Sequence, residues 1–212
     1  MILIGMFDSP FVRRVAVSMN LLKMPFEHRN WSVGKDFKQI QQFNPLGRVP
    51  TLVPESGEAL IESSAILDYL DECAGPERAL TPHSGKERHE TLRIMAIATG
   101  AAEKGVAQVY ETVFRPSEKH HRPWTDRCNT QMHAALAELD RVAMARAGSW
   151  LAGDRMSQAD ITATCAYTFL AETPAANCAA SSYPGLAAVA ARCEALPEFR
   201  SVKAKFFPPG EG

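Results

Sequence analysis

Short apolar runs alternate with amphipathic stretches over the first part of the chain. The apolar run 2–6 predicts a strand, and apolar residues at helical offsets of three, four and seven over 12–19 predict a helix. Residues 26–31 alternate between apolar and polar positions, which is typical of a second strand. The runs 51–53 and 59–61 flank a Glu-Ser-Gly-Glu turn and predict a hairpin.

A helix expected from Ser63 to about Cys73 completes this first unit. The order strand, helix, strand and then strand, strand, helix is typical of a thioredoxin-like layer, with helices on both faces of a small mixed sheet. The following residues 76–85 lack periodic apolar positions and contain two prolines, so they predict a linker. The predicted division is therefore a thioredoxin-like domain over 1–75, the linker, and a second domain over 86–212.

The second domain has a helical pattern throughout. Helices are predicted over roughly 86–115, 124–147, 158–173 and 184–206, the last broken at Pro197, and each has one apolar face to bury. A bundle satisfies this pattern most simply. The predicted fold class is thus an α/β thioredoxin-like domain followed by an all-α helical bundle.

Composition and charge narrow the function classes. The chain is 46% hydrophobic and 22% charged, as in ordinary globular proteins, and its 23 basic and 24 acidic residues leave a net charge of -1. Without a large positive field, neither a nucleic acid nor an anionic membrane is an expected partner. The opening MILIGM has no charged segment typical of a secretory signal, which favours a cytoplasmic location. The five cysteines are odd in number and form no C-x-x-C pair, so we expect reduced thiols.

The first motif that could carry chemistry is Asp8-Ser9-Pro10-Phe11, between the first strand and the first helix. Pro10 suits the first turn of a helix, because its missing N–H would have no partner there, and this leaves Ser9 near the N-cap position. A capping serine is the plainer interpretation. A reactive hydroxyl at the helix start is the alternative.

The second motif is the loop 44–51, which enters a strand through Val49-Pro50. Proline is tolerated at a strand start, and a cis peptide bond there would turn the backbone sharply. Such a bend can leave the N–H and C=O of Val49 free to pair with an extended peptide. An ordinary edge turn is the alternative.

The third motif is Glu62-Ser63-Ser64, where a strand ends and a helix begins. Ser63 is a natural helix cap, and the N–H groups of the next turn can bind a carboxylate. Glu62 adds a negative charge beside them. A ligand with an α-carboxylate and an α-ammonium, such as a γ-glutamyl group, would satisfy both features, whereas a capping serine beside a solvated glutamate needs no ligand.

Together, the motifs SPFVRRV, NPLGRVPTLV and ESSAILDYL resemble the glutathione site of the glutathione S-transferase family in type and order. The resemblance covers nearly the whole chain, and residues 157–160 look like the family's buried capping box, a folding motif. It implies a serine-type member, closest to tau-like and bacterial branches, with Ser9 as the activating hydroxyl. It also implies that glutathione is bound at Val49 and Pro50, with Val49 pairing with its cysteinyl backbone, at Arg48 through a carboxylate, and at Glu62 and Ser63 through its γ-glutamyl end.

The activity that this resemblance implies is transfer of glutathione, as co-substrate, to a small hydrophobic electrophile held by the helical domain, without a metal. A thiol with a reference pKa of about 8.5 needs help to ionise at neutral pH. A hydrogen bond from Ser9 and the positive end of the first helix would provide it. The resemblance also implies a homodimer. A glutathione-dependent isomerase or dehalogenase, and a non-catalytic binding protein, remain alternatives.

Two other features remain outside the predicted site. His120 and His121 lie in the proline-rich stretch 115–124, where a solvated loop is a better interpretation than a metal site. Tyr110, Phe114 and Trp124 could line an acceptor pocket or belong to the core between the domains.

Overall fold

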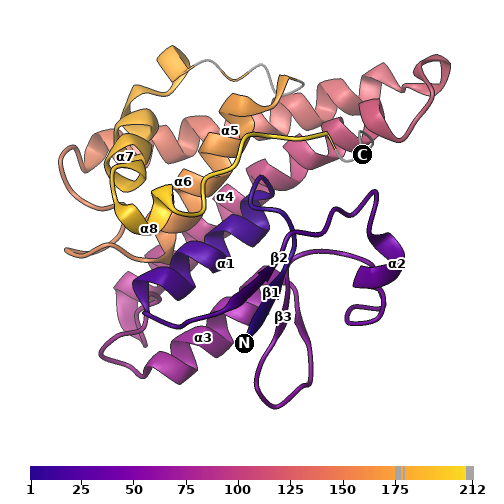
Figure 1. Ribbon diagram of the computed structural model, residues 1–212. Helices are drawn as coiled ribbons and strands as arrows, with labels where there is room; N and C mark the ends of the chain where they lie inside the picture. The colour runs from indigo at the N-terminus through magenta and orange to yellow at the C-terminus, as the bar shows by residue number, and fades with distance from the viewer. Residues whose placement is uncertain (175–177, 179, 209–212) are drawn as a thin grey trace.

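The computed structural model describes residues 1–174, 178 and 180–208, in which a small sheet domain packs against a larger group of helices (Figure 1). The strands are β1 (Ile2–Ile4), β2 (Glu27–Arg29), β3 (Thr51–Val53) and β4 (Leu60–Ile61). They lie in the order β2-β1-β3-β4, with β1 parallel to β2 and antiparallel to β3, and β3 antiparallel to β4. The predicted mixed sheet is confirmed.

Helices lie on both faces of this sheet. Helices α1 (Pro10–Leu21) and α3 (Ser63–Ala74) lie on one side of it, and the short α2 (Phe37–Ile40) lies on the other (Figure 1). The strand and helix positions agree with those predicted, apart from α2. This helix has only four residues, too few to produce an amphipathic period in the sequence.

The alternation of side chains along each strand explains the two helical layers. Leu3 and Leu52 are fully buried in the large core that includes α1 and α3. Ile4 and Val53, one residue further along their strands, instead pack with Ile40 of α2 in a second cluster. Because successive side chains of a strand point to opposite faces, these short strands have an apolar residue on each side.

The second domain consists of helices, as predicted. The elements described are α4 (Gly85–Val113), η1 (Ser117–Lys119), α5 (Arg122–Ala145), α6 (Gln158–Glu172), η3 (Ala180–Ser182), α7 (Pro184–Glu194) and α8 (Pro197–Arg200). In the part of the chain that the structure describes, no helix is long and apolar enough to cross a bilayer. No helix or strand occurs between α3 and α4, and the division of the chain into domains at this segment stays a proposal.

Two boundaries differ from those predicted. Helix α5 begins at Arg122, so the last three residues of the predicted loop 115–124 are helical. The final helix ends at Arg200 rather than 206, and residues 203–208 form a segment without regular structure. Figure 1 shows this segment crossing back over the helices toward the far side of the molecule.

A buried capping box begins α6, as predicted. Asp160 Oδ2 accepts a hydrogen bond from the Ser157 N–H at 3.0 Å, and its Oδ1 accepts one from the Leu151 N–H at 2.8 Å. Burial raises the pKa of Asp160, although these N–H groups oppose the effect. The carboxylate therefore holds the preceding loop against the helix start.

Arg13 joins α1 to the C-terminal helices. Its side chain is almost fully buried and donates two hydrogen bonds of 2.7 Å to the two carboxylate oxygens of Glu194. It also donates to the backbone C=O groups of Phe199 and Val202, both at 3.2 Å. A bidentate pair of this kind has a defined geometry, so it ties α1 to α7 in one relative orientation at this contact.

Candidate functional site

Ser9 lies at the N-terminus of α1, as predicted. Its Oγ accepts a hydrogen bond from the Val12 N–H at 3.4 Å, so it caps the helix, and Pro10 is the first helical residue. Accepting this bond leaves the hydroxyl proton of Ser9 free to donate. The capping interpretation is confirmed, and it is compatible with a chemical role.

Ser9 borders a cavity of about 560 Å³ between the two domains. Its walls combine residues of the β1–α1 loop, the loops around α2 and β3, helices α4 and α6, and the C-terminal segment. They are Met6, Asp8, Ser9, Pro10, Phe11, Trp31, Ser32, Val33, Phe37, Leu46, Gly47, Arg48, Val49, Val106, Val109, Tyr110, Phe114, Phe169, Phe206 and Phe207. Most of these side chains are apolar, and the cavity can hold a small hydrophobic molecule next to Ser9.

The peptide bond between Val49 and Pro50 is cis, which is the first of the two interpretations that the sequence left open for this loop. Asn44, which is buried, holds the loop in place: its Nδ2 donates to Arg48 C=O at 2.8 Å and its Oδ1 accepts from Leu46 N–H at 3.0 Å. Among the described residues, none is recorded as a hydrogen-bond partner of the Val49 backbone. Its N–H and C=O can therefore pair with an extended ligand.

A glycine brings the first two motifs together. Gly5, just after β1, has a φ of 130°, and a Cβ added there would lie 2.8 Å from Cβ of Val49 and 2.6 Å from Cγ2 of Val12. No larger residue fits between the two segments. The loop with Val49 therefore approaches the start of α1 closely.

Glu62, rather than Ser63, is the N-cap of α3, which corrects the sequence prediction. Glu62 has a φ of 70°, and its Oε1 accepts from the Ser64 N–H at 3.4 Å and from the Ser63 hydroxyl at 3.1 Å. Ser63 is the first helical residue, and its Oγ accepts a 2.6 Å hydrogen bond from Arg14 Nη2. Ser63 lies inside the helix rather than at its cap position, and its side chain bonds to Arg14 and Glu62 instead.

Arg14 supports this helix start from within the core, and the sequence interpretation missed it. Its side chain is 1% exposed, and it also donates to Ser64 Oγ at 3.0 Å. Burial lowers the pKa of Arg14 to about 10, opposed by the charge of Glu62. The feature of the sequence that could have pointed to this role is that Arg14 lies among the apolar residues of the first helix.

A smaller hollow next to the large cavity contains the third motif. It is lined by Phe11, Asn44, Leu46, Arg48, Val49, Pro50, Ile61, Glu62, Ser63 and Glu103. Phe11, Leu46, Arg48 and Val49 line both spaces, so the two adjoin. The six residues predicted as the glutathione site thus line one extended groove, from Ser9 at one end to Glu62 and Ser63 at the other. Glu103 of α4 also faces the groove and was not predicted.

Asp8 connects the groove to the C-terminal segment. Its Oδ2 accepts a hydrogen bond from the backbone N–H of Phe207 at 3.0 Å. Burial raises the pKa of Asp8, while N–H groups of Phe207 and Ser9 oppose that effect. Phe206 packs edge-on against Phe169 of α6, with ring centroids 5.8 Å apart. The segment therefore forms part of the cavity wall, which the sequence interpretation did not foresee.

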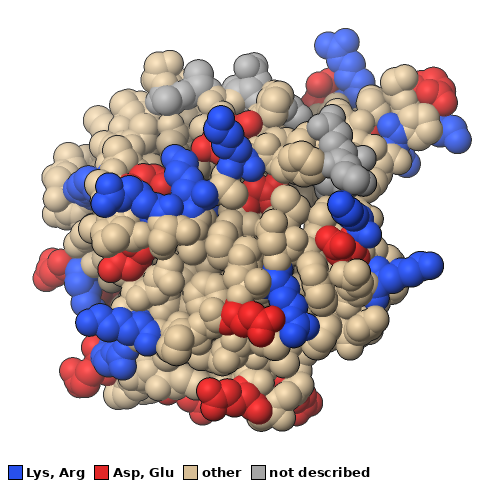
Figure 2. Space-filling view, viewed as in Figure 1, with Lys and Arg blue, Asp and Glu red and all other residues tan. Residues whose placement is uncertain are grey.

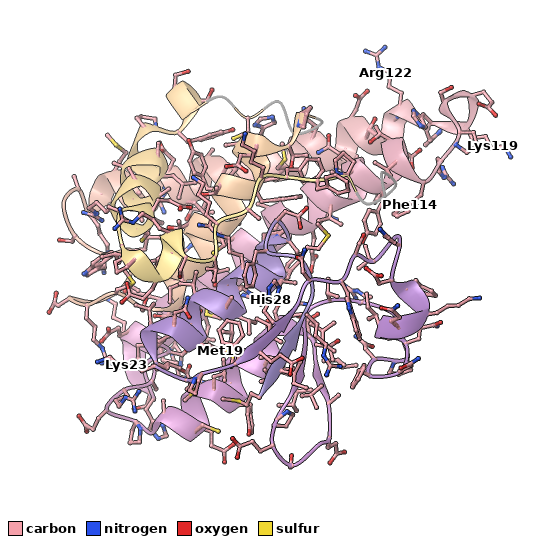
Figure 3. All side chains as sticks on the ribbon, viewed as in Figure 1. Met19, Lys23, His28, Phe114, Lys119 and Arg122 are labelled. Carbon is pink, nitrogen blue, oxygen red and sulfur yellow. The ribbon has the colours of Figure 1, made fainter. Side chains whose placement is uncertain are left out.

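The features left outside the predicted site divide into two groups. Tyr110 and Phe114 line the cavity, whereas Trp124 lies on a separate, shallow hollow with Tyr110. His120 and His121 are exposed, and the described residues contain no cluster of His, Cys, Asp and Glu suited to a metal. Figure 3 shows Phe114 at the end of α4, on the side of the helical domain that faces the N-terminal domain.

Comparison with known proteins matches both parts of the chain to one family. The family model described as glutathione S-transferase, N-terminal domain, matches residues 3–78. The model described as glutathione S-transferase, C-terminal domain, matches residues 105–197.

Individual relatives give the same result. The uncharacterized GST-like protein YibF of Escherichia coli is 30% identical over 168 residues, covering 79% of this chain and 81% of that protein. A probable maleylacetoacetate isomerase of Vibrio cholerae is 27% identical and covers 94% of this chain and 93% of its own length. A crystal structure of a glutathione S-transferase from Methylobacterium radiotolerans, in complex with glutathione sulfonate, superposes with a TM-score of 0.89 at 25% identity, covering 97% of this chain and 95% of that one.

Proposed function

This chain belongs to the glutathione S-transferase family, and from that premise we propose that it binds glutathione along the groove and transfers its sulfur to small apolar electrophiles. The observation that carries the proposal is the arrangement of three binding features along one groove. Ser9 borders the larger cavity, Glu62 and Ser63 border the smaller hollow, and Val49 lines both. Their order matches the thiol, peptide and γ-glutamyl groups of glutathione.

In the proposed complex, the cysteinyl part of glutathione pairs with the free N–H and C=O of Val49. The γ-glutamyl carboxylate lies at the N-terminus of α3, where the N–H groups of the first turn favour an anion. The α-ammonium lies near the carboxylate of Glu62. The positively charged side chain of Arg48 pairs with the second carboxylate of glutathione, that of its glycyl residue. The buried charge of Arg14 supports the anion at the helix start.

These contacts direct the thiol to Ser9. The Ser9 hydroxyl donates its unused proton to the sulfur, and the positive end of the α1 dipole favours the thiolate further. A charge-assisted hydrogen bond of this kind contributes about 1.5–3 kcal/mol. The thiolate then attacks an electrophilic carbon in the cavity, the S–C bond forms, and the leaving group departs with the electron pair of its own bond.

The proposal is tested by retention on glutathione-agarose together with turnover of chlorodinitrobenzene. Retention with turnover supports a transferase. Retention without turnover of this and other aryl and alkyl halides contradicts transfer to such acceptors, and if the isomerase substrate below is also left unchanged, it favours the non-catalytic binding protein. Absence of retention, with no binding in calorimetry, overturns the glutathione site itself.

A glutathione-dependent isomerase is the second candidate, because the Vibrio cholerae relative named above is a probable maleylacetoacetate isomerase. In that reaction the thiolate adds to a cis double bond, the resulting single bond rotates, and the thiolate leaves again. Glutathione is regenerated rather than consumed. Isomerisation of maleylacetoacetate by trace glutathione would favour this alternative, and a dehalogenase would instead release halide.

Three further expectations from the sequence stay predictions. They are the homodimer, the cytoplasmic location, and the division into a glutathione-binding domain over 1–75 and an acceptor-binding domain over 86–212. Light scattering on the purified chain measures the first of these directly, with twice the mass of 23.2 kDa as the expected result.

A further inference from the structure

Residues 5–8 form the loop that leads from β1 to Ser9, and β2 holds the first residue of this loop at both of its backbone groups. The Gly5 N–H donates to the Arg29 C=O at 3.0 Å, and the Gly5 C=O lies 2.8 Å from Nε2 of His28. A carbonyl oxygen can only accept a hydrogen bond, so Nε2 of His28 carries a proton and donates it. Because Gly5 is buried, the imidazole gives this carbonyl the hydrogen bond that water would otherwise supply.

The imidazole ring also supports the middle of the loop. It stacks on the ring of Phe7, with centroids 3.7 Å apart and an interplanar angle of 7°. His28 is paired in register with Leu3 of β1, which packs in the core with α1. Paired residues of neighbouring strands point to the same face of a sheet, so His28 lies on the face that α1 covers (Figure 3). One side chain of β2 therefore contacts the loop at two points, the Gly5 carbonyl and the Phe7 ring.

This loop sets the position of Ser9. The Ser9 N–H donates to the Met6 C=O at 3.2 Å, which closes a turn directly after Gly5. On its other side, the backbone of Gly5 lies so close to Val12 and Val49 that an added Cβ would clash with both. A rotation of the peptide group that follows Gly5 would therefore move Met6, and with it the turn that presents Ser9.

Resting on the proposed function, we propose that His28 is a positioning residue for the thiol chemistry, because its hydrogen bond to Gly5 holds the turn 5–9 in the orientation in which the Ser9 hydroxyl meets the sulfur of glutathione. His28 is not among the described residues that line the groove, so it acts through Ser9 rather than on the ligand. Hydrogen bonds weaken steeply as their atoms move out of line, so a small displacement of Ser9 weakens its bond to the thiolate. A reactive group on a loop needs such support to keep its geometry.

Two substitutions of His28 separate its hydrogen bond from its ring contact. His28→Phe keeps a ring against Phe7 and removes the donor, whereas His28→Gln keeps an N–H donor and removes the ring. The measurement is a pH titration of the thiolate absorbance of bound glutathione. We expect the thiol pKa to rise by about half a unit to one unit in His28→Phe, and by less than about half of that rise in His28→Gln. The Kd of glutathione should change by less than about threefold in both.

A double variant tests whether His28 acts through Ser9. Ser9→Ala has no hydroxyl to position, so adding His28→Phe to it should raise the thiol pKa by less than about 0.2 units. A role of His28 in folding alone would lower the stability of the protein without any such dependence on Ser9. His89→Phe is the matched control, because His89 is exposed on α4, and it should leave the thiol pKa unchanged.

A rise in His28→Phe that is smaller in His28→Gln and disappears on the Ser9→Ala background supports the inference. No rise in His28→Phe, an equal rise in His28→Gln, or the same rise without the Ser9 hydroxyl overturns it. If circular dichroism shows that His28→Phe is unfolded, His28→Gln decides: a thiol pKa near that of wild type supports the inference, and a raised one overturns it. The proposed function stands in all these cases. A wild-type protein that binds no glutathione overturns that function, and the inference with it.

Discussion

Glu62 combines a backbone role with a proposed ligand role. It has a left-handed φ of 70°, it caps α3 through its carboxylate, and it lines the groove. The same carboxylate accepts a hydrogen bond from Ser63, whose oxygen is held in turn by Arg14. The chain of contacts therefore fixes a negative charge at one end of the groove, with a buried positive charge behind it.

Loss of this charge should weaken glutathione binding and leave the rate of the chemical step almost unchanged. In Glu62→Gln the side chain can still cap the helix, but it no longer attracts the α-ammonium, so we expect the Kd of glutathione to rise about tenfold. The kcat at saturating glutathione should change little. Calorimetry and steady-state kinetics measure the two quantities.

Glu58→Gln is the control, since Glu58 is exposed in the β3–β4 turn and lines neither part of the groove. An unchanged Kd in Glu62→Gln would remove Glu62 from the binding site. A loss of kcat alone would also contradict the assignment, because it would indicate a role in chemistry.

The residues that could be predicted from the sequence are those whose roles are local. Ser9 before a proline and Val49 before another proline are recognised within a few positions, since capping and turn geometry depend on near neighbours. Arg14 could not be found in this way, because its partner Ser63 is 49 residues away. The same holds for Asp8 and Phe207, which are 199 positions apart. Only folding brings such pairs together.

At the scale of elements, helix α6 begins with a complete capping box, in which Ser157 and Asp160 satisfy each other's backbone N–H groups. Asp160 is fully buried and satisfies the N–H groups of Leu151 and Ser157. In Asp160→Ala both N–H groups would be buried without a partner, so we expect the free energy of unfolding to fall by about 2–4 kcal/mol. Urea unfolding at neutral pH measures this loss.

Asp154→Ala serves as the comparison, because Asp154 is exposed in the loop just before α6. We expect it to change the free energy of unfolding by less than about 0.5 kcal/mol. An Asp160→Ala protein as stable as Asp154→Ala would show that the capping box does not stabilise the fold.

Long amphipathic elements were predictable, and short or irregular ones were not. Helices α4 and α6 begin within a residue of their predicted starts, because their apolar periods are long. Helix α2 has four residues, and the segment 203–208 has no period at all. This segment contributes Phe206 and Phe207 to the cavity, so one wall of the cavity comes from the part of the chain with the weakest local signal.

At the scale of the molecule, the cavity lies where the two domains meet, and its walls come from both of them. Arg13 and Glu194 provide a bidentate contact between α1 and α7, with both side chains mostly buried. Side chains of both charges lie over the face of the molecule shown in Figure 2, as the near-zero net charge requires. Their mutual contacts on the surface contribute little compared with a buried pair.

The Arg13–Glu194 pair makes stability depend on pH. Burial alone would raise the pKa of Glu194, but hydrogen bonds from Arg13 and Thr168 and nearby positive charges lower it below its ordinary value of 4.5. A carboxyl with a lowered pKa in the folded state stabilises the fold above its unfolded pKa. That stabilisation is lost as the pH falls through the folded pKa.

Glu194→Gln should therefore destabilise the protein at neutral pH more than in acid. We expect the free energy of unfolding to fall by about 2–3 kcal/mol at pH 7, less than for a fully buried pair, because Glu194 is partly exposed. The difference from wild type should shrink as the pH is lowered below about 4. Urea unfolding at several pH values measures it, with the exposed Glu118→Gln as control. A pH-independent difference would contradict the role of the ion pair.

The most direct test of the whole account is a pH titration of the thiolate absorbance of bound glutathione, in the wild-type protein and in Ser9→Ala. Ser56→Ala, in the exposed β3–β4 turn, is the control. We predict a thiol pKa near or below 7 in wild type and in the control, and a value about one unit higher in Ser9→Ala, with glutathione still bound. The same thiol pKa in all three proteins, or a wild-type value near that of a free thiol, would contradict a sulfur activated by Ser9 at the start of α1.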